Sequence, residues 1–246
     1  MDFELPEELK LLQGAVRRFV QEELAPLERQ VEENDDFPET TRRALKQKAR
    51  ELGLWAICAP VAYGGGGLGA LARVMVAEEL GKVSVAVGYQ GGIIGGPRPG
   101  YWAFKEFAHA TEEQKQEFLV PVVKGAKEPF GAMTEPNADS DIANMETRAD
   151  RQSDSYVLNG GKIFITAVDS GDFGYVFAVT DWEKRRKGGI TCFFVDKHTP
   201  GLSWKPIPVM GRRGLHVYEL TFTDCAVPAG ISWAARPGPG NRLRRA

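Results

Sequence analysis

The sequence predicts an α+β protein in which an all-helical domain is followed by a β-barrel or β-sandwich domain. Apolar residues recur at helical spacing before about residue 128 and at a spacing close to two after it. Helices and strands are therefore segregated along the chain and do not alternate as in βαβ units. We expect a helical domain over residues 1–128, a β domain over 129–229, and a disordered tail over 230–246, where no apolar period is present.

Four amphipathic helices are predicted in the first half of the chain. The second begins near Pro38 and ends at Gly53, because proline suits the first turn of a helix and glycine suits its end. The fourth begins at Thr111, where Gln114 completes the spacing of a capping box. The residues expected on the buried faces are, helix by helix, Leu9, Leu12, Val16, Phe19, Val20 and Leu24; Leu45, Ala49 and Leu52; Leu71, Val74, Met75 and Leu80; Phe118, Leu119 and Val122.

About six or seven strands are predicted after residue 128, separated by turn-forming segments. The segment "SYVLNGGKIFIT" contains two short alternating runs around Asn159-Gly160-Gly161, which is a hairpin signal. The other predicted strands are "YVFAVT", "TCFFVD", "LSWKPIPV" and "VYELTFTD". Their spacing is typical of a barrel or a sandwich.

Composition excludes several classes of protein. The net charge of -2 gives no electrostatic support for nucleic-acid binding. The three cysteines form no CxxC pair, which favours a reduced setting. The acidic start "MDFELPEELK" is unlike a signal peptide, and no apolar run is long enough to cross a membrane. We therefore expect a cytoplasmic protein without nucleic-acid or membrane partners.

Common catalytic and binding motifs are also missing. The glycines at 64–67 lack the Lys-Ser/Thr of a phosphate loop, and "GGIIGG" at 91–96 does not lie in a βαβ unit. The three histidines, His109, His198 and His216, have no metal-ligand spacing, so no metal site is expected. No GxSxG nucleophile motif is present. Hydrolase and zinc-enzyme functions therefore have no support.

Two motifs with a fixed spacing carry a resemblance to a known family. The segment "AMTEPNADSD" is followed some twenty residues later by "YVLNGGKIFIT". Together with "YGGGGLG", "TEEQKQEFLVPVVKG" and "GRRGLHVYELTFTDCAVP", in that family's order, they make the chain resemble the acyl-CoA dehydrogenase family over residues 1 to about 229.

The resemblance implies an FAD-dependent oxidoreductase that removes two hydrogens across the Cα–Cβ bond of an acyl-CoA thioester. It implies that Met133 and Thr134 bind the pyrimidine side of the flavin and that Thr166 lies near flavin N5. It also implies that Phe164 forms a wall of the flavin site, with a place in the core as the alternative, and that Ile165 is a further cofactor-binding residue. It further implies that Ser140 contacts acyl-CoA, although its hydroxyl could instead cap the turn. Glu135 could serve only to brace that turn.

The sequence departs from the family pattern at three positions. Asn137 and Asp139 replace glycines, and both residue types tolerate turn and left-handed geometry. Asp139 also adds a charge near the expected thioester site. Phe164 replaces a tryptophan, which keeps an aromatic wall but removes an N–H donor.

The family's second helical domain, with its catalytic glutamate, has no counterpart in this sequence, so we expect a truncated chain and assign no catalytic residue. The tail after 229 does not resemble the family. In a shifted reading frame, Gly230–Trp233 allows Asn-Ile-Leu-Gly, which suggests a frameshift that the gene sequence would test; a deliberately truncated or naturally short chain is the alternative.

The resemblance also implies an electron-transfer flavoprotein as electron acceptor and a homo-oligomer. Two other functions stay open at this point. One is a non-catalytic flavin- or CoA-binding fragment or subunit, and the other is an acyl-CoA oxidase or flavin monooxygenase on the same scaffold.

Overall fold

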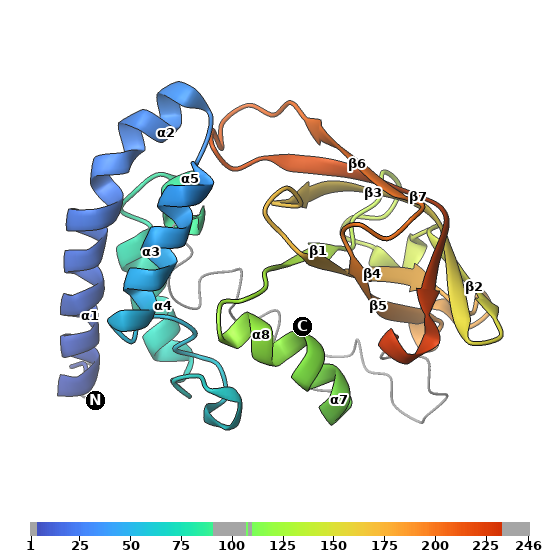
Figure 1. Cartoon of the computed structure of the whole chain (residues 1–246), viewed down its shortest axis with the longest axis horizontal. Helices are drawn as coiled ribbons and strands as arrows, with labels where there is room; N and C mark the ends of the chain where they lie inside the picture. The colour runs from blue at the N-terminus through green and yellow to red at the C-terminus, as the bar shows by residue number, and fades with distance from the viewer. Residues whose placement is uncertain (1–3, 91–106, 108–109, 233–246) are drawn as a thin grey trace. The chain divides into compact units, whose positions relative to one another are not determined.

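The computed structural model describes residues 4–90, 107 and 110–232, and the structural statements below concern these residues. The chain forms two compact units. The first consists of residues 1–108, 116–126 and 210–215, and the second of residues 109–115, 127–209 and 216–246. Helices come first along the chain and strands follow (Figure 1), which confirms the predicted α+β class.

The first unit is helical. Its α-helices are α1 (Glu7–Phe19), α2 (Glu28–Asn34), α3 (Glu39–Glu51), α4 (Ala70–Leu80), α5 (Val85–Gln90) and α8 (Val120–Val123). A π-helical turn, Val20–Leu24, and a 3₁₀ turn, Ala25–Leu27, join α1 to α2. Each predicted helix is present, and the "GGIIGG" segment lies outside the described residues.

The predicted buried face is correct for the fourth helix and partly wrong for the other three. In the first helix Val16, Phe19, Val20 and Leu24 are buried, but Leu9 and Leu12 are only half-buried. Leu52 is 56% exposed because α3 ends at Glu51, one residue earlier. Leu71 and Val74 are 53% and 65% exposed. The buried stripe of α4 instead runs through Ala72, Met75, Val76, Glu79 and Leu80. Ala72 and Glu79 complete the helical spacing of this stripe, and a search for large apolar residues overlooks both.

Glu79 can lie on a buried face because two cations neutralise it. Its side chain is 1% exposed, and its carboxylate accepts hydrogen bonds from Arg17 Nη2 at 2.9 Å and Lys82 Nζ at 2.6 Å. The Arg17 hydrogen bond is the main cause that holds the pKa of Glu79 below its usual range, against the effect of burial. This ion pair ties α1 to α4 within the helical unit.

The second unit begins with a capped helical turn, α7 (Glu112–Gln114). Gln114 N–H donates to the Thr111 hydroxyl at 3.3 Å, and Thr111 N–H donates to Gln114 Oε1 at 3.0 Å, so the predicted capping box is confirmed. Gln114 Nε2 also donates to the carbonyls of Gly230 at 2.8 Å and Ser232 at 3.3 Å. Residues 230–232 therefore pack against this unit, and the rest of the expected tail lies outside the described residues.

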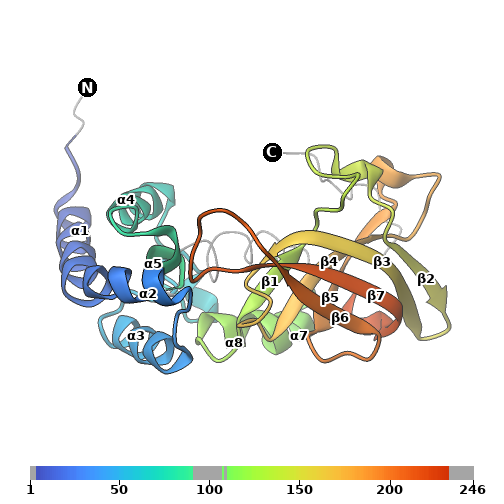
Figure 2. The ribbon, with the colours of Figure 1, turned by 90° about the horizontal axis from the view of Figure 1, so that it is seen from above.

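The strands of the second unit form one curled mixed sheet (Figure 2). Its described strands are β1 (Pro129–Ala132), β2 (Arg148–Gln152), β3 (Ser155–Thr166), β4 (Phe173–Val179), β5 (Ile190–Asp196), β6 (Leu202–Ile207) and β7 (Val217–Pro228). The order is β1-β4-β2-β3-β7-β6, and β5 also pairs with β4. β4 pairs with β1 and with one residue of β2 in parallel, and the remaining pairings are antiparallel.

The predicted hairpin at Asn159-Gly160-Gly161 is wrong. These residues lie inside β3, a single strand of 12 residues, and the reversal occurs earlier, between Gln152 of β2 and Ser155 of β3. Gly160 has φ +143° and coincides with a register shift against β7. Here the glycine forms a bulge that bends the strand and does not reverse it.

The inner face of the sheet forms the core of the second unit. Alternate residues of the strands supply it, including Leu158, Val176, Phe193, Leu220 and Phe222, each at most 2% exposed. Among the described residues, the helices are all too short or too polar to cross a membrane.

Candidate functional site

The first family-like motif forms a closed turn at the end of β1. After Ala132 the chain passes through Met133 and Thr134 to Glu135, whose N–H donates to Ala138 O at 3.0 Å while Ala138 N–H donates to Glu135 O at 3.1 Å. The turn therefore forms without its usual glycines. Neither Asn137 nor Asp139 has a positive φ, so left-handed geometry is not required at these positions.

A bulge in β3 brings the second motif to this turn. The pairing of β3 with β7 is interrupted between Lys162 and Ile165, and Phe164 has φ +58°. Within this interruption, Ile163 N–H donates to Thr134 O at 2.9 Å. The bulge thus redirects a backbone donor of β3 to the residue that follows β1. A phenylalanine in left-handed geometry is strained, and such strain is common at functional sites.

The residues predicted to bind flavin lie in and beside this bulge. Phe164 is 56% exposed, so its ring is available to a ligand. In the described part of the chain, the hydroxyls of Thr134 and Thr166 have no hydrogen-bond partner. Ile165 differs, because its side chain is 3% exposed within the core and only its backbone could contact a cofactor.

The residue predicted to bind the substrate, Ser140, lies apart from this group. It is exposed beyond the Glu135–Ala138 turn. Among the described residues its hydroxyl has no partner, so it does not cap the turn. No described hydrogen bond joins it to Met133, Thr134 or the β3 bulge.

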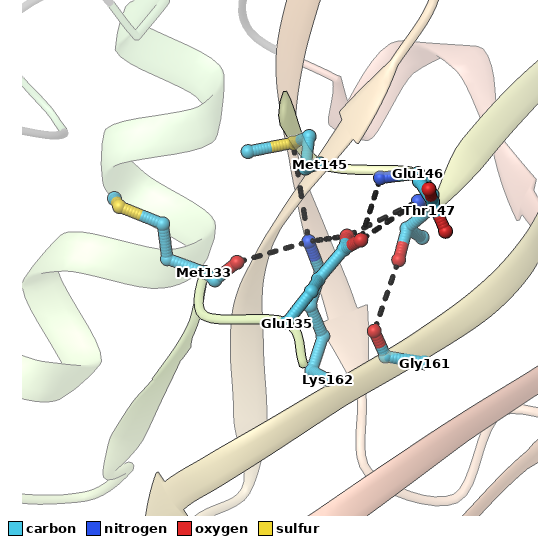
Figure 3. A network of polar contacts seen from close by, with 7 residues as sticks. All are labelled: Met133, Glu135, Met145, Glu146, Thr147, Gly161 and Lys162. Atoms are coloured by element: carbon cyan, nitrogen blue, oxygen red, sulfur yellow. Dashed lines mark hydrogen bonds and ion pairs between the residues drawn. The ribbon is translucent and has the colours of Figure 1, made fainter. Parts of the chain in front are cut away.

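A buried ion pair lies beneath the two motifs (Figure 3). Lys162 Nζ donates to Glu135 Oε1 at 2.7 Å, and the two side chains are 0% and 5% exposed. Burying an unpaired charge is costly, so each group depends on the other. The pair joins the turn after β1 to the bulge in β3.

Further hydrogen bonds complete this network. Glu135 Oε2 accepts from Glu146 N–H at 2.5 Å, and Oε1 accepts from Thr147 N–H at 3.1 Å. Lys162 Nζ also donates to Met133 O at 3.2 Å and lies 3.9 Å from Met145 Sδ. We refer to Met133, Glu135, Met145, Glu146, Thr147 and Lys162 as the Glu135–Lys162 network (Figure 3). It fastens three separate segments of the chain to one another.

Burial opposes the charges of both groups in this pair. It would raise the pKa of the Glu135 carboxyl, but the Lys162 charge and the hydrogen bonds from Glu146, Lys162 and Thr147 lower that pKa below its usual range. Burial lowers the pKa of the Lys162 ammonium, and Glu135 acts against this effect. The lowered pKa favours the ionised form of Glu135, and the charge of Glu135 favours the ammonium form of Lys162 beside it.

The role of Lys162 was not predicted from the sequence. A lysine within a strand usually points to solvent, and nothing in the alternation "YVLNGGKIFIT" marks this one as buried. The suggestion that Glu135 braces the turn agrees with its hydrogen bonds to Glu146 and Thr147. The signal that could have paired them is an acidic residue three positions after the end of β1 together with a lysine inside β3.

Comparisons with known proteins agree with this architecture. Residues 6–126 match the model of the acyl-CoA dehydrogenase N-terminal domain, and residues 131–225 match that of the acyl-CoA dehydrogenase middle domain. The chain belongs to the acyl-CoA dehydrogenase family.

Several individual proteins are similar to it. A mitochondrial isovaleryl-CoA dehydrogenase of Pongo abelii is 37% identical over 92% of this chain and 52% of its own length. The structure of butyryl-CoA dehydrogenase from Megasphaera elsdenii matches with a TM-score of 0.80 and 31% identity, covering 94% of this chain and 60% of that one. A glutaryl-CoA dehydrogenase from Mycobacterium smegmatis in complex with FADH2 matches with a TM-score of 0.79 and 27% identity, over 93% and 56%.

The matched part of these proteins is limited. The chain spans about half the length of the curated relative it matches, which corresponds to the N-terminal and middle domains.

Proposed function

We propose that this chain forms the flavin-edge and thioester-recognition part of an FAD-dependent acyl-CoA dehydrogenase. The observation that carries this proposal is the hydrogen bond from Ile163 N–H to Thr134 O, which brings the end of β1 to the Phe164 bulge. An exposed aromatic ring and two unpartnered threonine hydroxyls gather along these segments. Such a set of groups fits a flat heterocycle with a polar edge.

FAD would supply the hydride-accepting chemistry, and the protein would supply orientation and hydrogen bonds. We assign the Met133 and Thr134 backbone and the Thr134 hydroxyl to the pyrimidine edge of the flavin. Phe164 is assigned to the ring face, with the Ile165 backbone beside it, and the Thr166 hydroxyl to the redox-active edge.

The substrate we propose is an acyl-CoA thioester. Ser140, exposed and without a partner in the described residues, is the group that we assign to it. We assign no catalytic base to this chain. An electron-transfer flavoprotein is the proposed electron acceptor, by analogy with the family.

The first test is FAD binding. The purified full chain should quench the fluorescence of added FAD and acquire a visible flavin spectrum. Phe164→Ala should weaken binding by about tenfold, since aromatic stacking contributes roughly 1–3 kcal/mol. Trp182→Ala is the matched control, because Trp182 is an exposed aromatic residue of the same unit, at 44%, beside Arg185 in a different turn.

The second test is the reaction with substrate. Anaerobic addition of isovaleryl-CoA or butyryl-CoA to the flavin-loaded chain should perturb the flavin spectrum, and bleaching would indicate dehydrogenation. A chain that binds no FAD would refute the proposal. A chain that binds FAD but shows no spectral change with either thioester would limit its function to flavin binding.

A further inference from the structure

The Met133–Thr134 peptide group is held from its carbonyl side by a buried charge. Met133 O accepts a hydrogen bond from Lys162 Nζ at 3.2 Å, and the Lys162 side chain is 0% exposed. The described chain contains no cis peptide bond. In a trans peptide the C=O and the N–H point in opposite directions. The Thr134 N–H therefore points away from the buried ammonium.

The same peptide group has one polar group left for a ligand. Thr134 O accepts from Ile163 N–H at 2.9 Å, which fixes the next peptide in the chain against β3. In the described residues, neither the Thr134 N–H nor the Thr134 hydroxyl has a partner. Both groups belong to a residue that is only half buried. A donor pair is thus presented at a fixed position.

The charge of Lys162 changes the strength of this donor. A hydrogen bond from a cation is stronger than one from a neutral donor. Hydrogen bonds in series polarise one another, and the effect is larger where water is excluded. A cation on the Met133 carbonyl draws electron density from the amide, which makes the Thr134 N–H a better donor.

Glu135 keeps the ammonium in place for this purpose. It binds Lys162 at 2.7 Å and is itself fixed by the N–H groups of Glu146 and Thr147. The cation therefore cannot move to another partner without leaving Glu135 buried and unpaired. A simple structural ion pair would need only the bond between Lys162 and Glu135. Lys162 in addition donates a hydrogen bond to the Met133 carbonyl.

We propose that Lys162 is a positioning residue that strengthens the Thr134 N–H as a hydrogen-bond donor to an electron-rich carbonyl edge of the bound flavin. This inference rests on the proposed binding of FAD. The proposal extends the flavin site to Lys162, a residue that does not touch the cofactor and acts on it through the Met133–Thr134 peptide group.

The test removes both charges of the pair, which avoids leaving one of them buried alone. The variant Lys162→Met/Glu135→Gln is compared with wild type and with Lys205→Met/Glu219→Gln. The control removes the same two charge types from an exposed 3.1 Å pair on β6 and β7 of the same sheet. Lys162→Gln/Glu135→Gln is a second uncharged version, which can still hydrogen-bond and guards against misfolding of the first.

Two measurements follow on the full chain. Labelling with ¹⁵N-threonine reports the chemical shift of the Thr134 amide proton, and the loss of this signal in Thr134→Ser assigns it. The Thr134 amide proton signal should move upfield in both uncharged variants, whereas the Thr191 and Thr221 amide signals should stay in place. FAD affinity, from fluorescence quenching, should fall on the order of tenfold in these variants and stay unchanged in the control. With FAD bound, the infrared stretching frequency of a flavin carbonyl should be higher in the uncharged variants than in wild type.

The outcomes separate the two proposals. If wild type and the uncharged variants bind FAD equally well with the same carbonyl stretch, the role of Lys162 is overturned and FAD binding stands. A wild-type chain that binds no FAD overturns both. If Lys205→Met/Glu219→Gln weakens FAD binding as much as the uncharged variants do, the effect comes from removing charge anywhere on the sheet, and the assignment to Lys162 fails.

Discussion

Gly160 of β3 packs directly against the backbone of Thr147. A Cβ atom added at Gly160 would lie 2.6 Å from Thr147 Cα, and its φ of +143° belongs to a region that other residues rarely adopt. Thr147 also donates its hydroxyl to Gly161 O at 3.2 Å and its N–H to Glu135. This close contact therefore holds the Glu135–Lys162 network against β3.

The first prediction concerns this contact. Gly160→Ala should lower the free energy of unfolding by about 2–4 kcal/mol, because it combines a backbone clash with a strained φ. Urea denaturation of the purified chain measures this. Gly131→Ala is the control: its Cβ would meet only Tyr175, at 3.7 Å, so it should change stability by less than about 1 kcal/mol. Equal effects of the two substitutions would contradict the bulge geometry.

A second prediction separates the two charges of the buried pair. Lys162→Met alone leaves Glu135 ionised and buried, and should cost about 3–5 kcal/mol of unfolding free energy. Lys162→Met/Glu135→Gln should cost less than the single substitution. Lys205→Met, in the exposed pair, should cost at most about 1 kcal/mol. A double variant as unstable as the single one would show that the pair is not mutually dependent.

The third prediction is a dependence of stability on pH. The folded-state pKa of Glu135 lies below its unfolded value of about 4.3. Its contribution is therefore complete above that value and is lost as the pH falls through the lowered folded pKa. In Glu135→Gln, the slope of unfolding free energy against pH should be shallower in this acidic window, by up to about 1.4 kcal/mol per pH unit. Urea denaturation of wild type and Glu135→Gln at a series of pH values from neutral to this window measures the slope. Equal slopes of unfolding free energy against pH for the two proteins would contradict the prediction.

The fourth prediction tests the buried stripe of α4. Met75→Ala should cost about 2–5 kcal/mol because Met75 is 3% exposed. Leu71→Ser and Val74→Ser should each change stability by about 0.5 kcal/mol or less, since both side chains are more than half exposed in the described chain. Thermal or urea unfolding of the three variants gives the comparison. A large loss for Val74→Ser would mean that another surface covers this face.

Periodicity predicted most of the segments that form helices and strands, although α2 (Glu28–Asn34) and β2 (Arg148–Gln152) were not predicted. The first helix shows this, because Val16, Phe19, Val20 and Leu24 are at most 3% exposed. It failed where burial depends on partners far along the chain. Glu79 is buried because Arg17 and Lys82 neutralise it, and a pattern that counts only apolar residues cannot include it.

The site could be approached from the sequence only in part. Motif resemblance brought attention to Met133, Thr134, Phe164 and Thr166, and their flavin contacts remain predictions. The bulge at Phe164 was not foreseen, since a strand pattern gives no indication of where pairing is interrupted. The hairpin error has the same origin: Asn-Gly-Gly favours a bulge as well as a turn, and the pairing with β7 selects the bulge.

Gln114 does more than complete the capping box of α7. Its side-chain amide binds the carbonyls of Gly230 and Ser232, 116 and 118 residues later in the chain. A single side-chain amide thus clamps the residues that follow β7 to the turn that precedes β1, and so closes a long loop of the chain.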